Sequence, residues 1–261
     1  MQIVRFHDVH GPCTHGVRGA DGEIHCIQGD VFGTFHRLDL NVSPTKLEAP
    51  VCPPNVIAIG VNYADHAKET GKKPPDHPLV FIKLTTTVIG PGEPIILPDE
   101  APSEVDYEAE LAMVIGKPCR NVSEADALSY VLGYTCANDV SARDCQWRLD
   151  GQWARGKSFD TFCPLGPWIE TDLNPNDLGI RLLLNGKVMQ DSRTSQMLFG
   201  PAKLVSYLSR QFTLLPGTVI LTGTPHGVGF AQNPPTFLRP GDEVTVEIEG
   251  IGSLTNPVKR A

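Results

Sequence analysis

The sequence predicts an α+β chain that is mainly β, with few short helices and many tight turns. A Pro-Gly turn precedes an apolar strand pattern at three places along the chain. These turns are Pro91-Gly92, Pro216-Gly217 and Pro240-Gly241. With 25 glycines and 23 prolines in 261 residues, the chain is rich in residues that form tight turns. Apolar strands separated by such turns are typical of mainly β architectures.

Residues 1–49 form the first predicted domain, a small unit that is rich in short strands. Its strand patterns cover residues 3–6, 16–19 and 24–27. Prolines at positions 50, 53 and 54 then mark a linker, because proline and the residue before it disfavour regular structure. We therefore place the second, larger domain at residues 50–261.

The larger domain begins with two buried strands at residues 56–61 and 79–83, where apolar residues dominate. A short helix that ends at Gly71 is expected between them. Ser123 is a capping residue for a second short helix. A third helix is expected to start at Pro201. Its buried face would hold Leu204, Val205, Leu208 and Phe212.

The composition is that of a globular protein, with 41% hydrophobic and 20% charged residues. The formal net charge of −8 argues against nucleic-acid binding, which needs a basic surface. Seven cysteines without a Cys-x-x-Cys pair indicate reduced thiols and a cytoplasmic protein. No apolar run approaches the length of a membrane span, and no apolar leader follows Met1, so we expect neither membrane insertion nor secretion.

The most unusual stretch is residues 104–115, in which a single strand would place all odd-numbered side chains on one apolar face. The other face begins with four carboxylates, from Glu104, Asp106, Glu108 and Glu110. Such alternate carboxylates repel at roughly 6 to 7 Å, and no Lys or Arg interrupts the run to compensate them. Two structures are consistent with the pattern: a site for a hard divalent cation at Glu108 and Glu110, or an acidic edge strand that faces water.

Asp139 is the candidate for a third carboxylate ligand. It follows an apolar strand pattern and precedes the start of a short helix, indicated by Ser141 and Asp144. An acidic residue at a strand end, beside a helix N-terminus, is a common position for a ligand-binding group. It is also a common position for a helix-capping residue that binds no ligand.

A second candidate site lies in the short helix before Gly71, where His66 and Glu69 are three residues apart on one face. A carboxylate beside an imidazole raises the basicity of the imidazole and fixes its tautomer, as a general base that acts on water requires. The alternative is a solvent-exposed helix on which neither residue is catalytic.

Two further stretches offer groups for a substrate. Gly156-Lys157-Ser158 lacks the upstream glycine of a phosphate-binding loop, which excludes that motif, but Lys157 among aromatic residues could bind a substrate carboxylate or enolate. In the glycine-rich turn after residues 218–221, Thr224 offers a hydroxyl donor. The alternatives are an ordinary surface lysine and an ordinary turn.

Six motifs, taken together and in this order, resemble those of the fumarylacetoacetate hydrolase family. They are Gly60-Val61-Asn62-Tyr63 with His66 and Glu69, then Phe81-Ile82-Lys83, the acidic run at 104–111, Asn138-Asp139-Val140-Ser141-Ala142-Arg143-Asp144, Gly156-Lys157-Ser158-Phe159-Asp160-Thr161-Phe162, and Leu221-Thr222-Gly223-Thr224-Pro225. The resemblance covers roughly residues 50 to 258. It is strongest to the branch that includes acylpyruvases, oxaloacetate decarboxylases and tautomerases, and isomerases of hydroxy-dienedioates.

This resemblance implies a rolled, mixed β-sheet fold and a homodimer. It also implies a Mg²⁺ or Mn²⁺ ion, or alternatively Ca²⁺, held by Glu108, Glu110 and Asp139. His66 and Glu69 would activate water on a mobile lid, with Lys157 as a further catalytic residue. The implied substrate-binding residues are Lys83, Arg143, Gln146, Thr224 and Tyr63.

The implied function is hydrolysis of the carbon–carbon bond of a 2,4-diketo acid, an acylpyruvate such as fumarylpyruvate or maleylpyruvate. His66 would deprotonate a water that attacks the C4 carbonyl, and the cation and Lys157 would stabilise the departing pyruvate enolate. Because the same enolate arises in other reactions, the enzymatic alternatives are an oxaloacetate decarboxylase or tautomerase and a 2-hydroxyhepta-2,4-diene-1,7-dioate isomerase. The non-enzymatic alternative is a β-protein with a structural Ca²⁺ site.

Overall fold

The computed structural model describes residues 1–7, 14–71 and 73–261. The N-terminal strands are β1 (Gln2–His7), β2 (Thr14–Arg18), β3 (Ile24–Gly29), β4 (Phe35–Val42) and β5 (Lys46–Leu47). The later strands are β6 (Val56–Gly60), β7 (Leu79–Lys83), β8 (Val88–Ile89), β9 (Ile95–Leu97), β10 (Val105–Asp106), β11 (Ala109–Ile115), β12 (Val131–Asn138), β13 (Ser141–Ala142), β14 (Cys163–Glu170), β15 (Gly179–Leu184), β16 (Lys187–Arg193), β17 (Val219–Leu221), β18 (Glu243–Ile248) and β19 (Gly252–Arg260).

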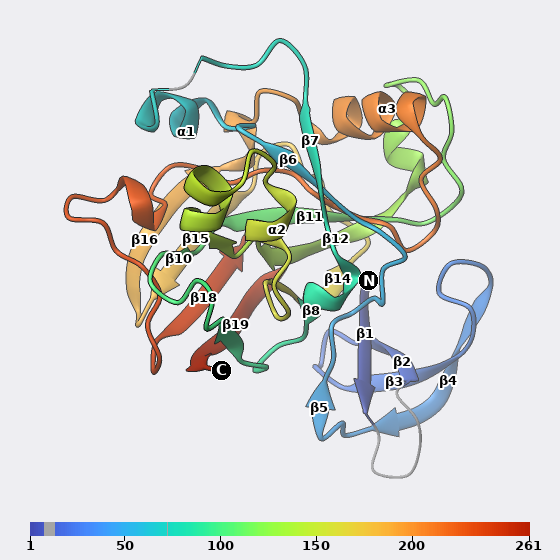
Figure 1. Cartoon of the computed structure of the whole chain (residues 1–261). Coiled ribbons are helices and arrows are strands. Elements are labelled where there is room, and N and C mark those ends of the chain that lie inside the picture. The colour runs from blue at the N-terminus through green and yellow to red at the C-terminus, as the bar shows by residue number, and fades with distance from the viewer. Residues whose placement is uncertain (8–13, 72) are drawn as a thin grey trace.

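The helices are short and lie in the connections between strands (Figure 1). They are α1 (Ala64–Glu69), α2 (Ala154–Lys157) and α3 (Pro201–Gln211), a π-helix (Cys145–Leu149), and 3₁₀ turns at Thr85–Thr87, Ala127–Tyr130, Thr194–Gln196 and Gly229–Ala231. The predicted α+β, mainly β class is therefore confirmed. No helix in the described ranges is long and apolar enough to cross a membrane.

One large sheet connects most of the molecule. Its strand order is β4-β3-β2-β1-β14-β12-β11-β17-β6-β7, with β5 paired to β1 and β8 paired to β14. A second sheet has the order β16-β15-β18-β19-β9, and β10 pairs separately with β13. Because β1 pairs with β14, opposing Ile3 to Ile169, the N-terminal strands continue the large sheet. The domain boundary at residue 49 stays a prediction.

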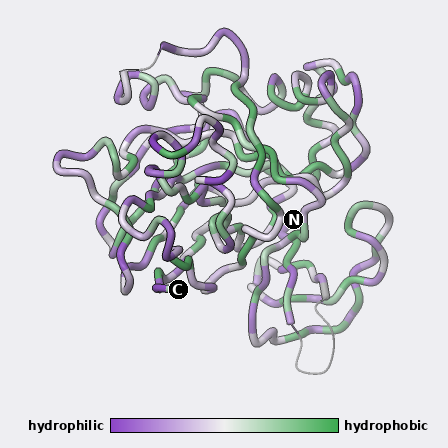
Figure 2. The backbone as a smooth tube through the Cα atoms, viewed as in Figure 1, coloured by the Kyte–Doolittle hydropathy of each residue, from purple (hydrophilic) through white to green (hydrophobic). Residues whose placement is uncertain are grey.

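Strand β11 is buried on both of its faces. Leu111 and Met113 pack in a core shared with the second sheet, whereas Ala112 and Val114 pack in the core on the opposite face. Figure 2 shows the strands in the middle of the molecule as largely hydrophobic, while the connection from α1 to β7 is largely hydrophilic. A strand covered on both faces lacks polar alternation, so a carboxylate at its start is forced into the interior.

The sequence predicted a single strand over the acidic run at residues 104–115, but the structure has two. The run is divided at Tyr107 and Glu108 into β10 and β11, and side chains replace the sheet partners at this break. The Tyr107 backbone N–H donates to Asp106 Oδ1 at 2.8 Å, and the Glu108 N–H donates to Asn138 Oδ1 at 3.0 Å. Such side-chain acceptors compete with the backbone ladder and end regular pairing.

The helix predictions are only partly correct. Helix α3 begins at Pro201 and buries Leu204, Val205 and Leu208, as expected. Phe212 does not share that face, because the helix ends one residue earlier and the Phe212 side chain is 40% exposed. The helix expected after Ser123 is only a 3₁₀ turn.

The burial of one face of α3 leads to a prediction about stability. We expect Leu208→Ala to lower the free energy of unfolding by about 2 to 5 kcal/mol, because Leu208 is fully buried and the change leaves a cavity. Phe212→Ala on the same segment is the matched control and should cost less than about 1 kcal/mol, since this ring is partly in solvent. Urea unfolding measures both, and equal losses would contradict the assigned burial.

Candidate active site

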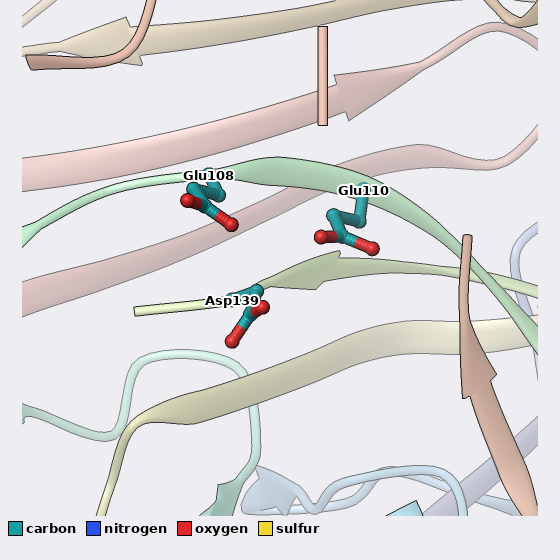
Figure 3. A group of neighbouring side chains, drawn as sticks. All are labelled: Glu108, Glu110 and Asp139. Atoms are coloured by element: carbon teal, nitrogen blue, oxygen red, sulfur yellow. The ribbon is translucent and has the colours of Figure 1, made fainter. Parts of the chain in front are cut away.

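The register between β11 and β12 brings three carboxylates together. These strands are antiparallel and oppose Ala109 to Asn138, so the preceding residue, Glu108, lies opposite Asp139. The Asp139 backbone N–H donates to the Glu108 carbonyl at 2.9 Å, which confirms this pairing beyond the strand end. Because side chains alternate along a strand, Glu110 projects on the same face as Glu108. Figure 3 shows Glu108 and Glu110 projecting from one ribbon toward the neighbouring ribbon that carries Asp139.

The three carboxylates form a compact set of oxygen donors. One oxygen from each of Glu108, Glu110 and Asp139 lies within 4.8 Å of the others, and all three residues are buried. Hard cations such as Mg²⁺, Mn²⁺ and Ca²⁺ prefer carboxylate oxygens. The donor set therefore fits one divalent cation and excludes the acidic edge strand facing water.

Buried cations from distant parts of the chain compensate the carboxylates. Lys157 Nζ lies 2.7 Å from both Glu108 Oε2 and Asp139 Oδ2, and Lys83 Nζ lies 2.5 Å from Asp139 Oδ1. Arg143 Nη1 lies 2.7 Å from Glu108 Oε1. The acidic run itself lacks Lys and Arg, but its counter-ions arrive from β7, from the residue after β13 and from α2. Lys157 is the last residue of the short helix α2, whereas the sequence alone predicted a lysine in a loop.

Glu108 and Glu110 have opposite electrostatic environments. Burial alone would raise the pKa of Glu108, but Lys157 and Arg143 outweigh burial and lower that pKa to about 2. Among the described residues, no cation forms an ion pair with Glu110, whose Oε2 accepts the Gly223 N–H at 2.6 Å. Burial, followed by the charges of Asp139 and Glu108, raises the pKa of Glu110 well above its usual value.

From the sequence alone, Glu104 and Asp106 are expected to be approach or surface residues and not metal ligands, but the two differ in the structure. Asp106 is fully buried, and its Oδ2 lies 2.8 Å from Arg143 Nη2. The backbone N–H of Gly229 donates to Asp106 Oδ1 at 2.7 Å. Asp106 therefore fixes Arg143 beside Glu108 and is not a surface residue. Glu104 lies near the surface and pairs with the exposed Arg148.

The predicted His66–Glu69 pair is present on α1. His66 Nδ1 lies 3.3 Å from Glu69 Oε2, and the Gly227 backbone N–H donates to Glu69 Oε1 at 2.8 Å. His66 is buried, which excludes a freely exposed helix face. The start of α1 is anchored by Asn62, which exchanges side-chain hydrogen bonds with the Phe199 backbone at 2.9 and 3.0 Å.

Most of the predicted site residues line one cavity. They are His66, Glu108, Glu110, Arg143, Gln146, Lys157 and Thr224. Asp139 and Lys83 lie behind this lining. Asp139 contacts Lys157, and Lys83 contacts Asp139. Tyr63 is fully buried at the start of α1 and bridges to Met197 through the backbone, away from the cavity lining.

The cavity also has aromatic walls that the sequence analysis did not assign. Trp153 packs edge-on against Phe81, with ring centres 5.6 Å apart, and Trp147 packs against Phe230 at 4.5 Å. All four rings line the cavity. Gly60 makes room for Trp153, because a Cβ at that position would lie 2.6 Å from the indole. The only sequence signal was the aromatic content around Lys157.

A family comparison agrees with the motifs. A family model described as fumarylacetoacetate hydrolase C-terminal matches residues 55–259. A Dictyostelium discoideum protein, a fumarylacetoacetate hydrolase domain-containing protein 2 homolog, is 47% identical over 243 residues, which cover 88% of this chain and 79% of the relative. A mitochondrial oxaloacetate tautomerase from Xenopus laevis is 48% identical over 224 residues, which cover 84% of this chain and 70% of the relative.

Solved structures extend the likeness to the N-terminal strands. A 5-carboxymethyl-2-hydroxymuconate delta-isomerase from Mycobacterium smegmatis has a TM-score of 0.89 and 45% identity, with all of both chains covered. A 2-hydroxyhepta-2,4-diene-1,7-dioate isomerase from Mycobacterium marinum has a TM-score of 0.87 and 42% identity, covering 100% of this chain and 98% of the other. Because both matches span the whole chain, the N-terminal strands β1 to β5 are part of the shared structure.

The raised pKa of Glu110 predicts that metal binding releases a proton. The protonated carboxyl must lose its proton before it can act as a ligand, so Mg²⁺ or Mn²⁺ affinity should rise as the pH rises toward that raised pKa. Titration calorimetry in two buffers with different ionisation enthalpies measures the proton released. Binding without proton release at mildly acidic pH would contradict the protonated state of Glu110.

The geometry also predicts which acidic residues matter for the metal. Glu110→Ala should weaken Mn²⁺ binding by at least about a hundredfold, because it removes a direct ligand. Glu104→Ala is the matched control on the same run and should leave the affinity unchanged, since Glu104 contacts only the exposed Arg148 side chain among described cations. Paramagnetic resonance of free Mn²⁺ gives both affinities, and a comparable loss in the two variants would place the ion elsewhere.

Proposed function

The chain belongs to the fumarylacetoacetate hydrolase family, and we propose that it is a metal-dependent enzyme that interconverts the keto and enol forms of a small 2-oxo acid. The resemblance expected from the motifs is confirmed by the family match and by relatives near 48% identity. Relatives include oxaloacetate tautomerases and isomerases, and both kinds of reaction move a proton at an enolate. Tautomerisation therefore takes precedence over the acylpyruvate hydrolysis expected first.

One observation carries this proposal: buried cations and an oriented imidazole line the cavity into which the carboxylates face. Lys157 and Arg143 are each 2% exposed, and His66 lines the same cavity. Burial would lower the pKa of Lys157, but Asp139 and Glu108 outweigh burial and raise it. Lys157 therefore remains a cation at neutral pH and attracts an anionic substrate.

The three carboxylates would hold the divalent cation. When bound, it would supply Lewis-acid polarisation of the 2-oxo group and charge stabilisation. The chain's own residues bind and orient the substrate: Lys157 and Arg143 face its negative charge, and Thr224 offers a hydroxyl. In a cavity of low dielectric, such fixed charges stabilise a developing enolate oxygen more strongly than water does.

His66 is the proposed proton carrier. Its Nδ1 faces Glu69, so its Nε2 is the nitrogen available to exchange a proton with substrate C3. In the enol-to-keto direction the enol oxygen loses its proton and C3 gains one, so no atom is gained or lost overall. Glu69 keeps the imidazole in this orientation because the Gly227 N–H holds its other oxygen.

Hydrolysis of an acylpyruvate is the second candidate, and the His66–Glu69 pair supports it. An imidazole oriented by a carboxylate can also deprotonate a water molecule. Attack of that water on C4 and cleavage of the C3–C4 bond would release a carboxylic acid and the pyruvate enolate, which gains a proton at C3. The same cations would stabilise the enolate in both reactions.

We expect the protein with Mg²⁺ or Mn²⁺ to accelerate the enol-to-keto conversion of oxaloacetate above the rate in metal buffer alone. His66→Gln should lower the rate by about a hundredfold or more, because it removes the proton carrier. His226→Gln is the matched control and should keep the rate, since His226 is half exposed and outside the cavity lining. Decay of enol absorbance measures tautomerisation, and pyruvate release from acetylpyruvate measures hydrolysis.

The two assays separate the candidates. Tautomerisation without pyruvate release supports the lead proposal, whereas pyruvate release that depends on His66 supports the hydrolase. Turnover of neither substrate, with tight Ca²⁺ binding retained, would support the non-enzymatic β-protein and reject both enzymes.

A further inference from the structure

Gln190 on β16 connects two parts of the site, although it lies behind the cavity. Its side chain is fully buried. Gln190 Oε1 accepts the backbone N–H of Ala109 at 2.8 Å, and Ala109 is the residue between Glu108 and Glu110. Gln190 Nε2 donates to Thr224 Oγ1 at 2.9 Å. One amide thus touches both the carboxylate strand and the threonine that lines the cavity.

The orientation of this amide follows from its backbone partners. The Ala109 N–H can only donate, so it requires the Gln190 oxygen. The carbonyls of Pro225 and His226 can only accept, and they lie 2.9 and 3.3 Å from the Gln190 nitrogen. If the amide were flipped, its nitrogen would face the Ala109 N–H and its oxygen would face the two carbonyl oxygens. The nitrogen therefore faces Thr224.

This orientation determines the hydrogen-bonding role of Thr224. A hydroxyl group has one proton to donate, and Thr224 Oγ1 already accepts from Gln190. In the part of the chain that the structure describes, no hydrogen bond uses the Thr224 proton. Thr224 is 5% exposed and lines the cavity. Its proton is therefore available to an acceptor bound there.

We infer that Gln190 is a positioning residue, which commits the Thr224 hydroxyl as a hydrogen-bond donor to an oxygen anion of the bound substrate. The inference rests on the proposed function, because it needs a 2-oxo acid in the cavity. Gln190 has no contact with the substrate itself. It excludes the alternative in which Thr224 points its proton at the protein and presents only lone pairs, which would repel a carboxylate or enolate oxygen.

A purely structural role for Gln190 is the competing explanation. The amide satisfies three backbone groups, so its loss would disturb the site even if Thr224 were irrelevant. The two explanations differ in whether the effects of Gln190 and Thr224 on anion binding depend on each other. If Gln190 acts through Thr224, its effect on anion binding disappears when the hydroxyl is already absent, whereas a structural effect remains.

The test is a double-mutant cycle on oxalate binding, with Mg²⁺ saturating and titration calorimetry as the readout. Oxalate resembles the carboxylate and enolate oxygens of the substrate. We expect Thr224→Val and Gln190→Met each to weaken oxalate binding by about tenfold or more, and the double variant to be no weaker than the weaker single variant. Gln232→Met is the matched control, because Gln232 donates to Gly227 on the same loop and does not contact Thr224.

A second variant covers the case in which Gln190→Met does not fold. Gln190→Leu has a shorter side chain than Gln190→Met and likewise removes the donor to Thr224. Oxalate binding should again fall by about tenfold or more, and adding Thr224→Val should change it no further. Urea unfolding confirms that each variant is folded.

Each remaining outcome overturns the inference. If the losses of oxalate affinity in the single variants multiply in the double variant, in both cycles, then Gln190 acts independently of Thr224. Normal oxalate binding by Thr224→Val would show that this hydroxyl is not a donor to the anion, while wild-type turnover would leave the proposed function intact. Failure of the wild-type protein to bind oxalate would reject this inference, and the two enzyme assays would then decide the proposed function separately.

Discussion

The compensation of buried charge is the constraint on which this structure depends. Asp106, Glu108, Glu110 and Asp139 are buried together, and three cations among the described residues, Lys83, Lys157 and Arg143, pair with them. Buried charges are tolerated only when they are paired and hydrogen-bonded. The cluster is therefore one positive charge short, and the deficit falls at Glu110, which has only the Gly223 N–H. A proton on Glu110 or a metal ion removes the deficit.

This charge balance links the fold to the chemistry. The three cations come from separate elements, so the cluster is complete only when β7, β11, β13 and α2 are correctly placed. A divalent cation would turn the net charge of minus one into a net charge of plus one. An anionic substrate would then neutralise the site. Lys157 and Arg143, which balance the carboxylates in the protein alone, line the cavity where that substrate would meet them.

The sequence predicted features that depend on local pattern. The alternation of side chains along a strand placed Glu108 and Glu110 on one face, and helical spacing placed His66 beside Glu69. The proline at position 201 correctly predicted the first residue of α3. The sequence could not establish the position of Asp139 opposite Glu108 from the residues alone, because that depends on the register between two strands. The counter-ions of the acidic run and the contacts of Gln190 were also inaccessible, since each joins residues far apart in the chain. Asp106 was misplaced for the same reason.

The arrangement divides the chemistry between two parts of the site. In the proposed function, Lys157 and Arg143, together with a cation held by the carboxylate cluster, would stabilise negative charge on the substrate whichever bond breaks. The His66–Glu69 pair lies on α1, a short helix held against the body by Asn62 and by the Gly227 N–H. In the proposed function, His66 would exchange a proton with substrate C3 in tautomerisation, whereas in hydrolysis it would activate a water molecule that attacks C4. Helix α1 would then place the same imidazole beside a common enolate site, and this proposed arrangement would account for the different reactions named for relatives with this fold.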